Sequence, residues 1–579
     1  MTDTATTTAN LNKFEKFKAQ KDGLAIKSEI EKFAALGWEA MDETDRDHRL
    51  KWVGVFFRPV TPGQFMMRLR MPNGILNSTQ MRVLAEVVQR YGDEGSADIT
   101  TRQNIQLRGI RISDLPDIFN RFHAVGLTSV QSGMDNVRNI TGDPVAGLDA
   151  DELYDTRELV QQIQDMLTNK GEGNPEFSNL PRKFNIAIAG GRDNSVHAEI
   201  NDLAFVPAFR EDMETRREVG ASASGDLNFG GHGDTGNLSQ TLSASPFGFG
   251  SSDSTGTAKT PTSSPRLPLF ASPIFGFNII VGGFFSAKRC EAAIPLNAWV
   301  APEDVVAVCR AVLEVFRDHG SRANRQKSRL MWLIDEWGLE KFRLEVENRL
   351  GKSLLPAAPK DEIDWEKRDH IGVYKQKQPG LNYVGLQIPV GRLYAEDMFE
   401  IARLAEVYGS GEIRFTVEQN IIIPNVAESR LGTFLTEPLL ERFSINPGLL
   451  TRSLVSCTGA QFCNFALIET KNRALAMIKA LEEELIFIHP VRIHWTGCPN
   501  SCGQPQVADI GLMGTKTRKN GKTLEGVDIY MGGKVGKDAH LGTCIIKGIP
   551  CEDLQPILQD LLIKNFGAKL KQEALAVGS

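Results

Sequence analysis

A block that reads strand, helix, strand occurs twice in the chain, and this repeat limits the fold more than any other feature. The first copy comprises FMMRLRMP, residues 78–91 and ADITTRQNIQLRGI, and the second comprises VGLQIPVGRL, residues 395–408 and GEIRFTVEQNIIIP. Gly74 and Tyr91 are 17 positions apart, and Gly391 and Tyr408 have the same separation. Such a repeat predicts two homologous halves.

A second pair of blocks supports the duplication once an insertion is set aside. NDLAFV is followed by NIIVGG, and ADIGLMG by DIYMGG, but Asp202 and Gly282 are 80 positions apart whereas Asp509 and Gly532 are 23 apart. The extra residues lie at about 211–266 and are dominated by Gly, Ser, Thr and Asn. This composition buries too little apolar surface to offset its ordering entropy, so we expect a disordered surface loop. A GxGxxG pattern inside it lacks the flanking strand and helix of a dinucleotide site.

Length and composition exclude several classes of protein. A chain of 579 residues is too long for one core and predicts several domains. With 66 basic and 72 acidic residues the net charge is −6, which argues against a nucleic-acid partner. We expect no membrane span, because no apolar run approaches the roughly 20 residues that one requires. The N-terminus has no signal-peptide core, and we expect a cytoplasmic monomer.

Four of the eight cysteines form two spaced pairs, CTGAQFC and CPNSC, and these predict a metal centre. The thiols of Cys457, Cys463, Cys498 and Cys502 can enclose either a zinc ion or an iron–sulphur cluster. The C-x5-C spacing is wider than a usual zinc knuckle, and neighbouring glycines leave room for amides to donate to sulphur, so we favour the cluster. The other cysteines are scattered singles that we interpret as buried small side chains: Cys290, Cys309, Cys544 and Cys551.

Three segments, TGAQFCNFALIETK, HWTGCPNSCGQPQVADIG and TTRQNIQLRG, closely resemble the sirohaem-dependent nitrite and sulfite reductases, especially the ferredoxin-dependent nitrite reductases. The resemblance covers roughly residues 50–570 without the insertion. It implies an α+β fold, a duplicated pseudo-twofold architecture with ferredoxin-like half-domains. The expected parts are a helical leader (1–50), a first ferredoxin-like half (51–135), a first sirohaem-binding domain (136–350), a linker with the second ferredoxin-like half (351–445) and a cluster and sirohaem domain (446–579).

The resemblance also implies the cofactors. Cys457, Cys463, Cys498 and Cys502 would hold a [4Fe–4S] cluster, and Cys502 would also ligate the sirohaem iron, with Asn500 touching the macrocycle. Sirohaem carries eight carboxylates, and burying them requires cations. Arg102, Gln106 and Arg108 alternate along TTRQNIQLRG, so we expect them on one face of a strand, bound to these carboxylates.

A second set of polar residues is implied to face the substrate side of the iron: Arg68, Arg138, Lys183 and Asn185. Arg70, Arg182 and Arg192 are alternatives nearby in the sequence. Sulfite reductases have K-x-K where this chain has Lys183-Phe-Asn185. Because nitrite is a monoanion and sulfite is partly a dianion near neutral pH, one cation fewer favours nitrite.

The resemblance, carried by these residues, implies six-electron reduction of nitrite to ammonia, as in nitrate assimilation. The sequence contains no flavin or nicotinamide module, so the expected electron donor is reduced ferredoxin. Ferredoxins are acidic and would dock on a basic patch, for which Arg322-Arg325-Lys327 and Lys516-Arg518-Lys519 are candidates. The alternatives are sulfite reduction by the same machinery, and a non-catalytic protein built around a four-cysteine zinc site.

Overall fold

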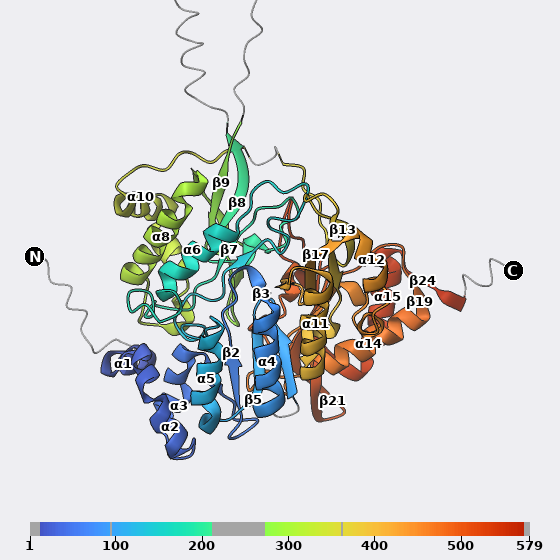
Figure 1. Cartoon of the computed structure of the whole chain (residues 1–579), viewed down its shortest axis with the longest axis horizontal. Helices are drawn as coiled ribbons and strands as arrows, with labels where there is room; N and C mark the ends of the chain where they lie inside the picture. The colour runs from blue at the N-terminus through green and yellow to red at the C-terminus, as the bar shows by residue number, and fades with distance from the viewer. Residues whose placement is uncertain (1–11, 93–94, 211–272, 360–362, 573–579) are drawn as a thin grey trace, which may run out of the picture. The chain divides into compact units, whose positions relative to one another are not determined.

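The computed structural model describes residues 12–92, 95–210, 273–359 and 363–572 (Figure 1). The chain divides into a large compact unit, 1–208 with 276–579, and a small one, 209–275. Every site discussed below lies in the large unit. The predicted disordered insertion at 211–266 falls outside the described residues. No helix in the described ranges has both the length and the apolar character needed to cross a bilayer.

Two five-stranded sheets carry the repeated block, but ADITTRQNIQLRGI and GEIRFTVEQNIIIP, each predicted as one strand, form two antiparallel strands joined by a turn. The first has the order β1 (Val55–Phe57), β2 (Phe65–Arg68), β5 (Ile105–Ile110), β4 (Ser96–Ile99), β15 (Arg392–Tyr394). The second has the order β13 (Gly372–Lys375), β14 (Leu381–Leu386), β17 (Ile421–Ala427), β16 (Glu412–Phe415), β3 (Ile75–Asn77). The last strand of each sheet comes from the other half of the chain, since β15 pairs with β4 and β3 pairs with β16. The two halves are therefore joined by a reciprocal exchange of strands.

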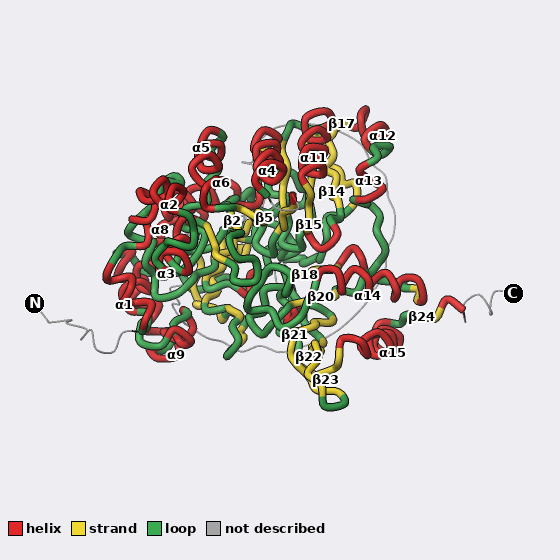
Figure 2. Tube along the Cα trace, turned by 90° about the horizontal axis from the view of Figure 1, so that it is seen from below, coloured by secondary structure: helices red, strands yellow, loops and turns green. Residues whose placement is uncertain are grey.

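The helices of these blocks are α4 (Ser78–Tyr91) and α11 (Ala395–Tyr408), with the bounds that the sequence predicts. They lie next to each other on the same side of the strands (Figure 2). The turns before them need glycine: a Cβ on Gly74 would lie 2.5 Å from the Phe415 carbonyl oxygen, and one on Gly391 2.9 Å from that of Ile99. Each turn therefore packs directly on the sheet of the other half.

A second pair of five-stranded sheets also matches in order. One reads β12 (Ile294–Val300), β9 (Ile274–Val281), β8 (Leu203–Arg210), β7 (Ile186–Ile188), β6 (Thr141–Gly142). The other reads β18 (Leu454–Ser456), β20 (Ile493–Thr496), β21 (Ile510–Lys519), β22 (Lys522–Met531), β23 (Thr543–Pro550). The strands β6, β7 and β8 run parallel, as do β18, β20 and β21.

The match between these sheets extends to single hydrogen bonds. The Asn185 N–H donates to Asp202 Oδ2 at 2.8 Å, and the Arg492 N–H donates to Asp509 Oδ2 at 2.8 Å. These findings confirm the duplicated α+β fold. The remaining helices are α1 (Lys13–Gln20), α2 (Ile30–Leu36), α3 (Glu43–Asp47), α5 (Leu115–Ala124), α6 (Arg157–Thr168), α8 (Val305–His319), α9 (Leu330–Trp337), α10 (Leu339–Leu350), α12 (Glu428–Phe434), α13 (Leu439–Arg442), α14 (Lys471–Glu484) and α15 (Leu554–Phe566). Short strand pairs complete the structure: β10 (Phe284–Phe285) with β11 (Cys290–Glu291), and β19 (Leu485–Ile486) with β24 (Lys569–Leu570).

Candidate cofactor and substrate site

The two cysteine motifs begin where two neighbouring parallel strands end. Cys457 follows β18, and Cys498 comes two residues after the end of β20. The carboxyl ends of adjacent parallel strands meet at one edge of a sheet, and the Cys457 N–H donates to the Trp495 carbonyl oxygen at 3.1 Å. Gly503 then turns back so closely that a Cβ there would lie 2.0 Å from the same oxygen. The strand pairing thus brings both motifs together.

The four thiols influence one another electrostatically, which places them in one cluster. The Cys502 residue is exposed, yet the desolvating atoms around it and the Cys457, Cys498 and Cys463 thiols raise its pKa, while nearby Lys183 opposes this shift. Such thiols resist ionisation in the absence of a cation and are suited to a soft metal centre that stabilises thiolates.

Hydrogen bonds to sulphur accompany this cluster. The Gly497 N–H donates to Cys457 Sγ at 3.1 Å, and Asn500 Nδ2 donates to Cys498 Sγ at 3.5 Å. A Cβ on Gly497 would lie 2.9 Å from that of Ala466, so the glycine is needed to bring the amide to the thiol. Donors of this kind adjust the electron affinity of an iron–sulphur centre. The structure places Asn500 beside a cluster thiol, and its contact with the macrocycle stays a prediction.

A buried ionic network supports the C-x5-C loop. Asp98 pairs with Arg108 at 2.6 Å and with Arg392 at 3.0 Å. Arg108 also donates to Thr458 Oγ1 at 2.7 Å, and both guanidinium groups lie over the Phe462 ring, between Cys457 and Cys463 in the sequence. Arg108 is thus already engaged by Asp98, although its Nη1 is buried without a hydrogen-bond partner among the described residues.

The expectation that Arg102, Gln106 and Arg108 share one strand face is wrong for Arg102. The strand β5 begins at Ile105, and Arg102 lies in the turn before it, because Gln103 has a positive φ of 53°. Gln106 accepts a hydrogen bond from Arg108 Nη2 at 3.1 Å. Their sirohaem contacts stay a prediction.

The turn that contains Arg102 contacts the Cys502 loop directly. Thr101 Oγ1 donates to the Cys502 carbonyl oxygen at 3.0 Å. Arg102 Nη2 donates to Asn201 Oδ1 at 2.7 Å, whereas its Nε is buried with no partner in the described part of the chain. Burial lowers the pKa of Arg102 to about 10, which indicates an arginine with spare donors that an anion would stabilise.

Arg68, Arg138 and Lys183 form a group of half-buried cations, with Arg68 and Lys183 near the Cys502 thiol. Burial and then the Arg58 charge lower the pKa of Arg68 to about 10. Burial, followed by Arg68 and further arginines, holds the pKa of Arg138 well below its usual range. The pKa of Lys183 is also well below its usual range, because of burial and then two neighbouring arginines, while the Cys502 thiol acts in the opposite direction. We call Arg68, Arg138 and Lys183 the cationic chamber. Mutual repulsion among cations in a partly desolvated site makes the chamber a receptor for a small anion.

The backbone of Asn185, two residues after Lys183, is held by a buried ion pair. Its backbone N–H donates to Asp202, and Asp202 is in turn held by Arg329 through contacts of 3.0 and 2.5 Å. No side-chain hydrogen bond fixes the Asn185 amide among the described residues, which leaves its carboxamide available to a ligand.

The three alternative arginines have different surroundings. Arg70 donates to Gln164 and to the carbonyl oxygens of Gln131, Val137 and Arg138, so it shapes the backbone before the chamber. Arg192 donates to the Asp151 carbonyl oxygen instead. Arg182 is the alternative that joins the chamber, because it lowers the pKa of both Lys183 and Arg138.

Sequence reasoning missed Arg58 and Arg329. Arg58 lies near the Cys463 and Cys502 thiols, burial lowers its pKa to about 10, and its buried Nε lacks a partner among the described residues. The signal was a lone arginine directly after the apolar segment VGVFF. Arg329 carried no local signal, since its partner Asp202 is 127 positions away.

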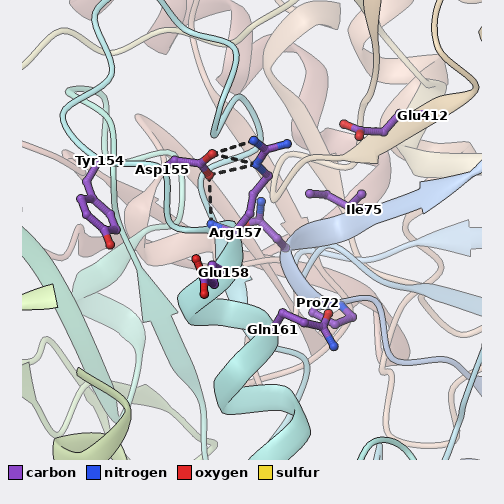
Figure 3. A pocket seen from close by; sticks show the side chains of 9 residues that line it. Pro72, Ile75, Tyr154, Asp155, Arg157, Glu158, Gln161 and Glu412 are labelled. Carbon is purple, nitrogen blue, oxygen red and sulfur yellow. Dashed lines mark hydrogen bonds and ion pairs between the residues drawn. The ribbon is translucent and has the colours of Figure 1, made fainter. Parts of the chain in front are cut away.

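A separate cleft of about 760 Å³ lies over the start of α6 (Figure 3). Its charged lining residues are Asp155, Arg157, Glu158 and Glu412, and Arg157 is paired with Asp155 at 2.6 Å. Because the cleft has three carboxylates and only one cation, its negative charge makes it unsuitable for an anionic substrate. None of the predicted site residues lines it.

Comparisons with known proteins agree with this geometry. The model for the nitrite and sulphite reductase 4Fe-4S domain matches residues 133–354 and 448–562, and that for the nitrite/sulfite reductase ferredoxin-like half domain matches 59–125 and 374–439. Each model matches twice, as the duplicated sheets require.

The full-length relatives include a ferredoxin–nitrite reductase from Leptolyngbya laminosa, 65% identical over 99% of this chain and 100% of the relative. The chloroplastic ferredoxin–nitrite reductase of Spinacia oleracea is 48% identical over 97% of this chain and 86% of the relative. The solved structure of the Mycobacterium tuberculosis NirA protein has a TM-score of 0.78 and 27% identity, covering 95% of this chain and 93% of that one. The chain therefore belongs to the nitrite and sulphite reductase family.

Proposed function

We propose that the protein reduces nitrite to ammonia with six electrons taken from reduced ferredoxin. The observation that carries this proposal is the cationic chamber beside Cys502, which combines an anion receptor with a four-thiol metal centre. The names of the full-length relatives support the same activity.

The residues present fit both cofactors of the family. Cys457, Cys463, Cys498 and Cys502 would hold the [4Fe–4S] cluster, with Cys502 shared with the sirohaem iron. The unpartnered donors of Arg58, Arg102 and Arg108 suit carboxylates of the macrocycle, with Gln106 and Asn500 as further polar contacts. When bound, these groups supply single electrons to nitrite at the haem iron.

The protein's own side chains bind the anion and deliver protons. Arg68 and Arg138 provide fixed positive charge for the nitrite oxygens. Lys183, whose pKa lies well below its usual range, donates a proton from Nζ more readily than an exposed lysine does, as oxygen leaves as water. The neutral Asn185 contributes a hydrogen bond without a further charge, which favours a monoanion over a dianion.

Ferredoxin is the proposed donor, and the ion pairs in the two candidate patches support one of them as its docking surface. In the first candidate patch Arg325 is paired with Asp135 and Arg322 with Glu15, which leaves only Lys327 exposed without an ion pair among the described residues. Lys519 is likewise paired with two acidic residues. Lys516 and Arg518 are exposed at alternate positions of β21 and form no ion pair among the described residues. We also propose a cytoplasmic monomer, which fractionation and light scattering would test.

Turnover of the purified holoenzyme tests this function. We expect visible absorption from sirohaem and the cluster, and one ammonia formed per nitrite consumed with reduced ferredoxin. If the enzyme formed sulfide from sulfite faster than ammonia from nitrite, its substrate would be sulfite and the proposal would be wrong. A colourless protein that contains zinc at the four thiols would contradict both assignments.

A further inference from the structure

The first half of the chain contains the pseudo-twofold counterpart of the cluster site. Gly142 ends β6 and Ser456 ends β18, and each donates its N–H to the side-chain oxygen of an equivalent glutamine, at 3.0 and 2.9 Å. The residues that follow are Asp143 and Cys457. Asp143 therefore stands where the second half has its first cluster cysteine.

The neighbouring loops correspond in the same way. Gly142 is paired with Ile188 across parallel strands, as Ser456 is with Trp495. Gly191 lies three residues after Ile188, and Cys498 lies three residues after Trp495. Because Gly191 has no side chain, the Asp143 carboxylate occupies the space beside it: a Cβ on Gly191 would lie 2.2 Å from Asp143 Oδ2.

Three potential metal ligands meet at this position. The side chains of Asp143, Asp193 and His370 are buried and offer ligand atoms that all lie within 4.8 Å of one another. His370 Nε2 lies 2.5 Å from Asp193 Oδ2, and its Nδ1 lies 3.1 Å from the Tyr383 hydroxyl. The three ligands come from three segments: the loop after β6, the loop after β7 and the residues before β13.

This cluster has an unbalanced charge. No lysine or arginine in the described residues forms an ion pair with Asp143 or Asp193; the nearby Lys367 and Arg368 are paired with Glu418 and Asp149. Two buried carboxylates thus share one imidazole.

We propose that Asp143, Asp193 and His370 bind one divalent cation, Zn²⁺, as the counterpart of the cluster in the second half. One imidazole nitrogen and two carboxylate oxygens form an accepted ligand set for zinc, with Tyr383 as an outer partner that orients the imidazole. Zinc displaces the proton between His370 and Asp193. Ligands about 2.0–2.2 Å from a tetrahedral ion lie roughly 3.3–3.6 Å apart, so these two atoms, now 2.5 Å apart, separate by about 1 Å on binding.

Metal analysis of the purified holoenzyme tests this site independently of nitrite turnover. We expect about one zinc per chain beyond the iron of the two cofactors. Zinc lost on dialysis against a chelator should return on titration with zinc chloride, with a 1:1 endpoint. Asp143→Asn should lower zinc at least fivefold while the iron content and visible spectrum stay unchanged. Asp193→Asn should do the same if the first variant does not fold.

Asp149→Asn is the matched control, because Asp149 is a buried carboxylate of the same loop that pairs with Arg368 and lies outside the cluster. It should retain full zinc. The unfolding temperature of the wild type should rise on zinc addition, and that of Asp143→Asn should not. Less than one fifth of an equivalent of zinc in the titrated wild type, or equal zinc in the wild type and Asp143→Asn, would overturn the proposal.

Discussion

Gln103 and Gln419 make the same hydrogen bonds in opposite halves of the molecule. Gln103 Nε2 donates to the Phe415 carbonyl oxygen at 3.1 Å, and Gln419 Nε2 donates to that of Ile99 at 2.9 Å. Both glutamines have a positive φ, 53° and 67°. Each one therefore fastens its own turn to the ferredoxin-like sheet of the other half.

The two glutamines differ in what their side-chain oxygens support, and this difference gives a first prediction. Gln419 holds the Ser456 N–H next to Cys457, whereas Gln103 holds the Gly142 N–H next to Asp143. Either change to alanine leaves buried backbone groups unpaired, at a cost of about 1–3 kcal/mol each. We expect both variants to lose similar stability, but only Gln419→Ala to lose cluster iron and acid-labile sulphide. Equal iron content in both variants would show that Gln419 does not position the cysteine loop.

Replacing Cys502 by serine tests the shared thiolate. In the proposed arrangement this residue belongs to both cofactors, and its thiol lies near Lys183 of the cationic chamber. We expect Cys502→Ser to abolish nitrite reduction and to change both the haem absorption and the cluster's electron paramagnetic resonance signal. Cys551→Ser, a buried cysteine of the 3-10 turn before α15, is a control that should keep both signals. Wild-type spectra and turnover in Cys502→Ser would refute the assignment of Cys502 as the thiolate shared by the two cofactors.

The repeat in the sequence predicted α4 and α11 with their observed bounds, because glycine turns and apolar spacing are local signals. The exchange of β3 and β15 between sheets was not predictable in this way, since local pattern does not encode the partner of a strand. The same limit applies to single residues. The pairing of Arg108 with Asp98 depends on a facing strand, and the placement of Arg102 depends on one positive φ.

The cysteine motifs predicted the metal centre because four thiols at that spacing have few other uses. The cations of the chamber, by contrast, come from separate loops and were identified only through the family resemblance. Arg58 has the same surroundings yet was missed, since a single arginine after an apolar segment is not distinctive by itself.

His494 should make the fold sensitive to mild acid. Burial lowers its pKa to about 3, and its Nδ1 lies 3.1 Å from the Gln504 carbonyl oxygen in the loop after Cys502. A pKa below the unfolded value of about 6.5 means that the unfolded chain binds more protons, so this contribution is present above pH 6.5 and lost as the pH falls. Between pH 7 and pH 5 the loss amounts to about 2 kcal/mol.

The measurement is the free energy of unfolding, or the unfolding temperature, at pH 5, 6 and 7 for the wild type and His494→Asn. Asparagine can keep the hydrogen bond to Gln504 but cannot titrate. We expect a flatter dependence on pH in the variant. Parallel curves for the two proteins would exclude His494 as the source of acid sensitivity.

Charge reversal at Lys516 or Arg518 should weaken ferredoxin binding. A Cβ on Gly514 would lie 2.5 Å from the Gly497 carbonyl oxygen, so β21 passes directly beside the C-x3-C loop, and Lys516 is roughly 7 Å further along the strand. We expect Lys516→Glu to raise the KM for ferredoxin by about tenfold at low salt, and less at high salt. Turnover with reduced methyl viologen should not change.

Lys32→Glu on α2 makes the same change in net charge on an exposed residue and serves as the control. It should leave the KM for ferredoxin near the wild-type value. Equal effects of Lys32→Glu and Lys516→Glu would indicate a general charge effect and no local docking surface.

Asn185→Lys should shift substrate choice towards sulfite. The new ammonium would stand beside Lys183, on a backbone that the Asp202–Arg329 pair holds in place. At a partly desolvated site an added cation favours the dianion by about 1–3 kcal/mol, which corresponds to roughly a 5- to 150-fold rise in the sulfite-to-nitrite ratio of kcat/KM. Asn185→Gln enlarges the side chain without adding charge and should leave the ratio near that of the wild type. Steady-state kinetics with both anions and one chemically reduced donor measure the ratio without any contribution from ferredoxin docking. If the ratio stays constant in an Asn185→Lys enzyme with full cofactor content, the charge at position 185 does not set the choice between the two anions.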